Sequence, residues 1–441
     1  MSPSSRRSRI LDLALPIIGG MVSQNVLNLV DTLMVSRLGD AALAGVGLGS
    51  FANFMCTAFI TGLSAGVQAM SARRLGEGRA SEQAVPLNGG LLLALVLGVP
   101  MFIALFASVP AWFPLLASDA AVRAEGEPYL QARLAGLVAI GMNFSFRGYF
   151  NGVNQSRLYM RTLVVMHVTN VVVSYVLIFG SLGAPALGAT GAGLGSAIAT
   201  WVGTLTYVTL SLRHARAAGF LRGLPDLSTT KTMLRLSVPA GLQQLFFAAG
   251  MTALFAIIGR VGTRELAASN VLINLLLVAL LPAMGFGLAS ASLVAQALGR
   301  GDQGDARRWA WEVVRIAVVA ISALALPALL VPDLVLGLFL TDTETLALAR
   351  WPLRIIALGM PLEALGIVLM LSMQGAGDTR TVLLVSVGLQ WIVLLPAVYL
   401  VGPVLGYGLL GIWLTQAVYR LVQSGLFAVL WSRGHWAAVR V

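Results

Sequence analysis

The sequence has few charged residues and almost no cysteine. Charged residues make up 11% of its 441 residues, whereas soluble domains usually carry about 25%. The one cysteine, Cys56, excludes a disulfide framework, and the 48 glycines have no three-residue period, which excludes a collagen. Because 58% of the residues are hydrophobic, the composition is that of a membrane protein rather than a soluble one.

Motifs of common enzyme classes are also missing. The chain has no Walker A sequence and no HExxH zinc motif. A stretch that resembles a nucleophile elbow, Gly193–Ala197, lacks the last glycine of that motif. We therefore expect no enzymatic activity, no cofactor and no resident metal. The net charge of +11 does not indicate nucleic-acid binding in a membrane protein. The basic residues instead indicate which side of the membrane each loop occupies.

Long apolar segments are what the sequence does contain. A helix that crosses a bilayer needs about 20 apolar residues, and the chain offers segments of that kind throughout its length. We predict an all-α polytopic membrane protein with 12 transmembrane helices. The predicted spans are 11–35, 46–70, 88–109, 129–150, 160–181, 190–211, 236–257, 269–295, 312–332, 352–373, 382–403 and 408–431.

The basic residues give these spans an orientation. Lys and Arg in short loops gather on the cytoplasmic side of a membrane. Clusters at 6–9, 73–79, 213–235 and 300–315 stand before the first span and at alternate ends of the later ones. Both termini are therefore predicted to be cytoplasmic. The scarcity of lysine and the abundance of alanine and glycine are typical of a GC-rich bacterial genome, so we expect the bacterial plasma (inner) membrane.

The two halves of the chain resemble each other. The longest polar stretch, 213–235, is predicted to be a cytoplasmic linker between an N-lobe at 1–212 and a C-lobe at 236–441. Each lobe holds six spans, so the copies share one orientation, which indicates a pseudo-two-fold axis along the membrane normal and a substrate path between the lobes. One constant shift along the sequence aligns, without gaps, Pro16 with Pro239, Arg37 with Arg260, Gly62 with Gly285, Gly136 with Gly359, Gly152 with Gly375 and Arg157 with Arg380.

Two acidic residues fall well inside predicted spans. A charge near the middle of a bilayer costs at least about 2.5 to 3.5 kcal/mol and by default marks a site. Asn28 and Thr32 flank Asp31 at helical spacing, so their oxygens are expected to converge on a proton or a small cation. Glu363 stands in an apolar run, where a buried carboxyl group could exchange protons. The alternative for each is a carboxyl group that only hydrogen-bonds a neighbour.

Two other polar side chains lie in predicted spans, and the sequence leaves their roles open. Arg420 either pairs with an acid or an anionic substrate group, or extends to the membrane surface. His167 has no acid beside it in the sequence, so a hydrogen-bonded interior residue is a better interpretation than a ligand.

Three motifs together resemble the multidrug and toxin extrusion family, and in particular its DinF-like bacterial branch. They are NLVDTLMVSRLG at 28–39, PAGLQQ at 239–244 and GAGDTR at 375–380. The resemblance covers nearly the whole chain. It implies a secondary antiporter, in which inward flow of protons or sodium ions drives the export of cationic or amphipathic compounds by rocking of two six-helix lobes.

The resemblance also implies a cation site in the N-lobe. Asp31 matches the family's first-helix aspartate and Asn170 its fifth-helix asparagine, which makes these two the candidates to hold a sodium ion. Ser174 stands where other members have a second Asp or an Asn, and Ser196 occupies a sixth-helix Thr position. Pro16 matches a first-helix proline implicated in bending.

The C-lobe matches the family less completely. Glu363 lies 15 residues before Asp378, as expected of the tenth-helix acid of the sodium-coupled branch. Phe247 stands in place of that branch's seventh-helix glutamate, so its two-acid site is incomplete here. Glu363 is therefore a second candidate for ion coupling.

Other functions remain as alternatives. A lipid-linked saccharide flippase of the same superfamily should have a more basic cavity than Arg147 and Arg420 provide. A membrane-embedded enzyme would need a converging catalytic set, and an ion channel would produce single-channel currents. The expected protein works as a monomer in the lipid bilayer, on small cationic or amphipathic substrates.

Overall fold

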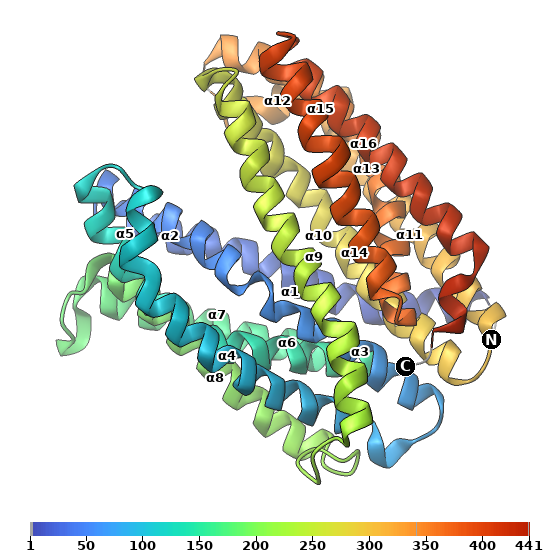
Figure 1. Cartoon of the computed structure of the whole chain (residues 1–441). Helices are drawn as coiled ribbons and strands as arrows, with labels where there is room; N and C mark the ends of the chain where they lie inside the picture. Colours follow the sequence, from blue (N-terminus) through green and yellow to red (C-terminus); the bar gives the residue numbers. More distant parts are fainter. Residues whose placement is uncertain (1–2, 341, 440) are drawn as a thin grey trace. The chain divides into compact units, whose positions relative to one another are not determined.

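The computed structural model describes residues 3–340, 342–439 and 441, and these form helices joined by short loops, with no β-strand among them (Figure 1). The predicted twelve spans correspond to twelve helical runs, and a short helix, α12 (Pro332–Gly337), follows the ninth. The runs are α1 (Pro3–Ser36), α2 (Asp40–Ala58) with α3 (Leu63–Gly76), α4 (Val85–Trp112), α5 (Ala120–Leu134) with α6 (Leu137–Gly152), α7 (Ser156–Phe179), α8 (Gly188–His214), α9 (Leu227–Gly259), α10 (Thr263–Gly299), α11 (Gln303–Leu330), α13 (Thr343–Ala376), α14 (Thr379–Gly388) with α15 (Leu395–Tyr399), and α16 (Gly408–Arg433).

Most of these runs could cross a membrane by length and composition alone. Within the described part of the chain, nine helices are long and apolar enough. The runs α5–α6, α8 and α16 complete the twelve. The run α5–α6 is broken into helices of 15 and 16 residues, each too short to cross alone. Arg420 lies in α16, and α8 is rich in glycine, which lowers the apolar content of these two helices.

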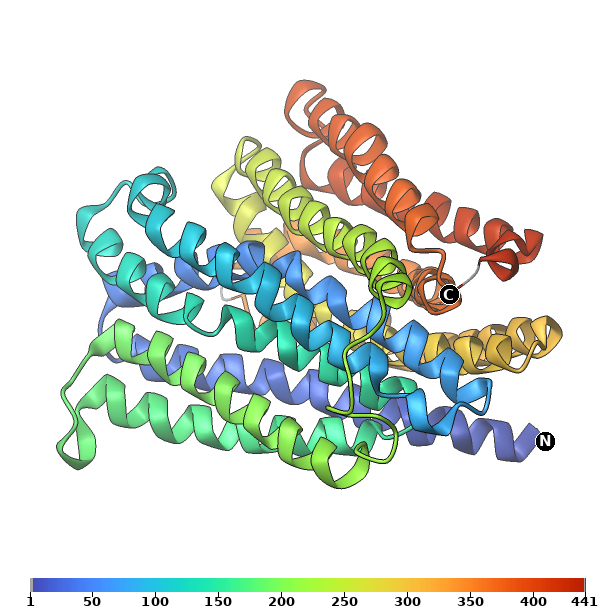
Figure 2. The same cartoon turned by 60° about the horizontal axis from the view of Figure 1, so that its bottom comes forward.

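Aspartate side chains set where many helices begin. The carboxylates of Asp119, Asp226, Asp302, Asp342 and Asp378 each accept a hydrogen bond from a backbone N–H in the first turn that follows. These caps start helices in polar sequence, before the apolar windows begin. Thus α9 starts at Leu227, inside the predicted 213–235 linker, and the thin segment 215–226 joins it to α8 (Figure 2).

The chain divides into two compact units, unit 1 with Met1–Ile18 and Leu245–Val441, and unit 2 with Gly19–Gln244. The chain passes between them twice, once inside α1 and once inside α9. Each of these helices is therefore shared by both units. The predicted division keeps α1 whole in the N-lobe and places the boundary between linker and C-lobe inside α9, at residue 236. Pro16 and Pro239, which the repeat aligns, lie in these two helices shortly before the crossings.

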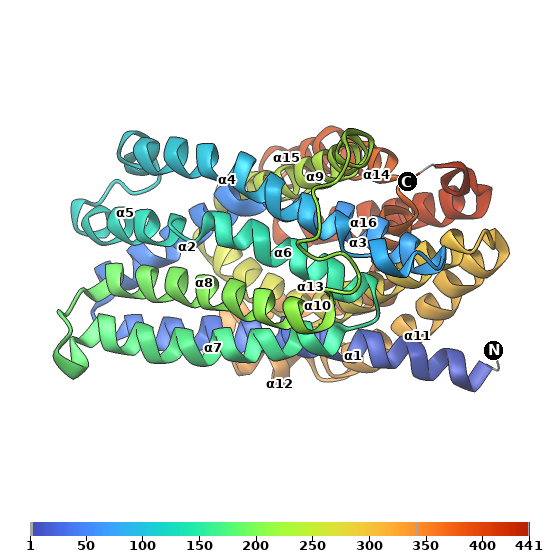
Figure 3. The same ribbon diagram turned by 90° about the horizontal axis from the view of Figure 1, so that it is seen from below.

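Unit 2 is built from pairs of neighbouring helices. Helix α7 packs along α8, α2 packs on α5, and α6 contacts both α3 and α4 (Figure 3). Helix α5 also packs on α8, which brings side chains of α5, α7 and α8 into one neighbourhood.

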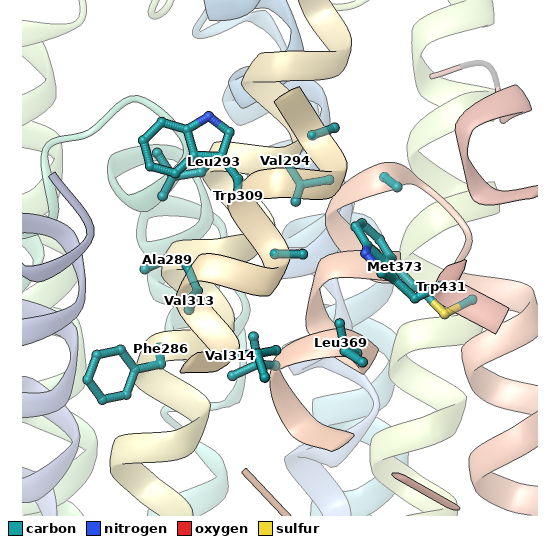
Figure 4. Close-up of a cluster of buried hydrophobic side chains, with 14 of the residues drawn as sticks. Phe286, Ala289, Leu293, Val294, Trp309, Val313, Val314, Leu369, Met373 and Trp431 are labelled. Carbon is teal, nitrogen blue, oxygen red and sulfur yellow. The ribbon is translucent and has the colours of Figure 1, made fainter. Parts of the chain in front are cut away.

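Unit 1 is organised around α13, which packs against α10, α11 and α16. One core cluster of this unit contains bulky side chains of these helices, including Leu293, Trp309, Leu369, Met373 and Trp431 (Figure 4). The first helix also contributes, because Ile10, Leu13 and Ala14 belong to the same cluster. Burying a large aliphatic side chain contributes about 1.5–3 kcal/mol, so these contacts hold the start of α1 on unit 1.

Close backbone contacts recur in both halves, in agreement with the internal repeat. A Cβ atom built on Gly152 would lie 3.0 Å from the Gln68 carbonyl oxygen, and one on Gly375 would clash with that of Ala291. The constant shift that aligns the two halves relates these two contacts to each other. A second pair of contacts follows the same shift. Gly62 lies against Gly241 in unit 2, and Gly285 lies against Ile18 in unit 1. The aligned glycines are therefore positions of close helix packing.

A charged cluster fastens the N-terminal turns of α1 to unit 1. The Arg6 guanidinium donates to Asp305 at 2.6 Å and to Glu312 at 2.8 Å, and it stacks 3.8 Å above the Trp309 ring. Arg300 and the Trp309 indole also donate to the Asp305 carboxylate, both at 2.9 Å. Burial alone would raise the pKa of Asp305, but the hydrogen bond and charge of Arg6, with the other donors, hold that pKa below its ordinary value.

The lowered pKa of Asp305 predicts a pH-dependent contribution to stability. A group with a depressed pKa stabilises the fold above its unfolded-state value of about 3.9 and loses this effect as the pH falls through the folded-state value. Asp305→Asn should therefore lower the midpoint of thermal unfolding at neutral pH. The difference between the midpoints of the variant and the wild type should become smaller below about pH 3.9. Thermal unfolding of the purified protein across this range measures both.

The control is Asp333→Asn. Asp333 forms an exposed ion pair with Arg350 at 2.6 Å, and exposed pairs contribute little. An Asp305→Asn midpoint equal to that of the wild type at neutral pH would contradict the stabilising role of the cluster.

Candidate functional site

Three contacts place Asp31 opposite Ser174 in unit 2. Helices α1 and α7 meet where Gly20 abuts Leu163 and where Gln24 hydrogen-bonds His167 at 3.3 Å. Nearer their other ends, Val35 and Ile178 share one buried cluster. In all three pairs the residue on α7 follows the residue on α1 by the same number of positions in the sequence. Ser174 follows Asp31 by that same number. This constant offset indicates parallel helices in register, with the Asp31 carboxylate on α1 at the level of Ser174 on α7.

A chain of hydrogen bonds connects α7, α8, α5 and α2 beside this point. The Asn170 amide donates to the Ser196 hydroxyl at 3.0 Å, and Arg133 donates to the same hydroxyl at 3.1 Å. Arg133 also donates to the Tyr129 hydroxyl at 3.0 Å, which is 2.7 Å from the Ser50 hydroxyl. The predicted Asn170 and Ser196 are thus brought together, and Ser174 lies one turn beyond Asn170 on α7.

Three oxygens of this cluster are buried without a hydrogen-bond partner: Asp31 Oδ1, Asn170 Oδ1 and Ser174 Oγ. Buried polar atoms are nearly always paired, so such atoms need an explanation. They are the acceptors that a proton or a small hard cation uses. Gly195 makes this arrangement possible, because a Cβ there would clash with Ser174 Oγ, and α8 could not otherwise pack so close. We name Asp31, Asn170, Ser174 and Ser196 the Asp31 cluster.

Two predicted neighbours of Asp31 do not join this cluster by any hydrogen bond in the described structure. The Thr32 hydroxyl donates to the Asn28 backbone carbonyl at 2.8 Å, and the Asn28 side chain accepts from Gln24 at 3.3 Å. Both residues are exposed. Helical spacing places them on neighbouring faces of α1, and their side chains are engaged within that helix.

The second predicted acid has an arginine beside it. In unit 1, Arg420 Nη2 of α16 lies 3.3 Å from Glu363 Oε1 of α13, and the two side chains are 19% and 9% exposed. The contact is an ion pair without an aligned hydrogen bond, so Oε1 keeps no donor. Arg420 also donates to the Gln423 amide oxygen at 3.3 Å. The structure thus answers the question left open for Arg420, which pairs with an acid.

Sequence reasoning misses Arg133, Tyr129 and Ser50. The sequence pattern assigns Arg133 to the basic residues at the outer ends of spans, since its predicted span begins at 129. The structure places it on α5, one turn after Tyr129 and against α8. The available signal is the polar sequence from Ala120 to Leu134, which is helical and continues into α6 across a two-residue break.

Comparisons with known proteins agree with this fold. The MatE family model matches residues 16–176 and 239–400. A probable multidrug resistance protein NorM of Synechococcus sp. is 29% identical over 437 residues, covering 95% of this chain and 92% of that protein. A probable multidrug resistance protein NorM of Pseudomonas aeruginosa is 28% identical over 415 residues, covering 92% and 84%.

Two solved structures share the fold. An outward-facing multidrug resistance MATE family transporter of the MOP superfamily matches with a TM-score of 0.89 at 22% identity, covering 99% of this chain and 97% of that one. A MOP superfamily transporter from Pyrococcus furiosus matches with a TM-score of 0.88 at 22% identity and the same coverage. With the family model matching both halves of the repeat, the chain belongs to the MatE family of multidrug and toxin extrusion transporters, which are multi-pass membrane proteins.

Proposed function

We propose that this protein is a secondary antiporter of the bacterial inner membrane, with both termini cytoplasmic. It exports cationic or amphipathic compounds and is driven by inward flow of protons or sodium ions. The observation that carries the proposal is the Asp31 cluster, in which one carboxylate oxygen of α1 and two oxygens of α7 are buried without a hydrogen-bond partner. That helix is one of the two that both compact units share.

This position explains how an ion could drive transport. A ligand shifts a conformational equilibrium only if its affinity differs between the two states. Asp31 lies in the part of α1 that belongs to unit 2, while the turns before Gly19 belong to unit 1. Neutralising the carboxylate therefore changes the charge on a helix that any movement of the two units must bend or rotate. Pro16, just before the crossing, lacks a backbone N–H and weakens the helix there.

Ion coupling at Asp31 can be tested by a single substitution. Asp31→Asn keeps the size of the side chain but removes the titrating group, so the affinity difference between the two states should disappear. In liposomes, dye export driven by a proton or sodium gradient should fall to the level of protein-free liposomes. The control is Asp40→Asn, which changes an exposed acid in the first turn of α2. Full gradient-driven export by Asp31→Asn would refute the proposal.

Substitutions at Glu363 and Arg420 distinguish ion coupling by Glu363 from simple balance of the Arg420 charge. Removing one partner of a buried pair costs about 3–5 kcal/mol, because the other charge is left uncompensated. Glu363→Gln and Arg420→Gln should each lower the midpoint of thermal unfolding, and the double variant should recover part of the loss. Dye transport decides the role. Recovery of transport in the double variant indicates charge balance, and its continued absence with restored stability indicates that Glu363 itself carries protons.

A further inference from the structure

The Asp31 cluster contains a cation of the protein's own. Arg133 Nη1 donates to the hydroxyls of Ser196 and Tyr129, at 3.1 and 3.0 Å. Asp31 Oδ1 of the same cluster is buried and has no hydrogen-bond partner. The guanidinium is therefore held in the Asp31 cluster by two neighbouring hydroxyls.

These hydrogen bonds remove one oxygen from any metal site. The Ser196 hydroxyl oxygen accepts from both Asn170 Nδ2 and Arg133 Nη1, and a hydroxyl oxygen has two lone pairs. Asp31 Oδ1, Asn170 Oδ1 and Ser174 Oγ remain free. Hard metal cations are typically held by about six to eight oxygen atoms. A proton needs only one, and it binds covalently.

The charge of Arg133 also disfavours a metal cation at Asp31. The guanidinium repels any further cation at the carboxylate, and the repulsion is strong where water is scarce. A sodium ion, held by several weak contacts, cannot offset that repulsion as an O–H bond does. Two further titratable groups of the described structure lie near this part of α1. Tyr129 on α5 shares a buried cluster with Val35, and the His167 ring on α7 hydrogen-bonds the Gln24 side chain two turns before Asp31. The contributions from α8 and α2 are the uncharged Ser196 and Ser50.

We propose that Arg133 is a tethered cation that takes the place of a sodium ion and excludes metal cations from the Asp31 cluster. The inference rests on the proposed function and removes sodium from its two candidate coupling ions. Arg133 is a positioning and specificity-determining residue, because it acts on the ion through Asp31 and Ser196.

The test is direct binding of radioactive sodium ion to the purified protein. The wild type and Arg133→Lys, which both keep the charge, should bind no sodium at the cluster. Arg133→Gln should bind sodium at the cluster, with an affinity at least about tenfold above the weakest binding that the assay detects, and the double variant Asp31→Asn with Arg133→Gln should lose that binding. Arg123→Gln is the matched control on the same helix and should behave as the wild type. Arg133→Met provides a second neutral side chain in case Arg133→Gln does not fold.

Two results would overturn the inference. One is sodium binding by the wild type that Asp31→Asn abolishes. The other is a folded neutral variant, with a cooperative thermal unfolding transition, that still binds no sodium. Dye transport under a proton gradient, with sodium replaced by potassium, tests the proposed function separately. Absence of wild-type transport together with the expected binding pattern would remove the antiporter proposal and leave the ion selectivity of the site standing.

Discussion

A charge held among membrane-spanning helices needs a partner from another helix of the same bundle, and the rest of this structure is arranged around that constraint. Arg133 on α5 finds the hydroxyls of Tyr129 and Ser196 beside Asp31, and Arg420 on α16 lies beside Glu363 on α13. A carboxylate without such a partner would be strongly disfavoured in hydrocarbon. The charged residues therefore decide which helices must be neighbours, while apolar side chains fill the space between them.

The fold was predictable because hydrophobicity and glycine carry most of its information. Twelve apolar segments indicated the spans, and the constant shift between the two halves predicted contacts that the structure contains, such as those of Gly152 and Gly375. Helix ends were less accessible, since caps such as Asp119 and Asp226 start helices in polar sequence that hydropathy assigns to loops. The sharing of α1 and α9 between units depends on long-range packing, and no local pattern reports it.

The candidate site was predictable where the residue type is unusual for its surroundings. Asp31 stands out in an apolar helix, and the family resemblance supplied Asn170, Ser174 and Ser196. Arg133 could not be found in that way, because arginines near the ends of spans are common and usually reach water. Its role depends on α5 packing against α8, which is a property of the folded chain. The exposed positions of Asn28 and Thr32 show the converse limit, since helical spacing alone places residues near Asp31 without directing their side chains toward it.

The sharing of α1 also affects how the protein is made. Residues Ile10, Leu13 and Ala14 pack into a core built from α10, α11 and α13, and the Arg6 side chain pairs with Asp305 and Glu312. These partners are synthesised in the second half of the chain, long after the first helix. The contacts of the first turns can therefore form only after the second half of the protein has been synthesised, and the core of unit 1 is incomplete without the first helix.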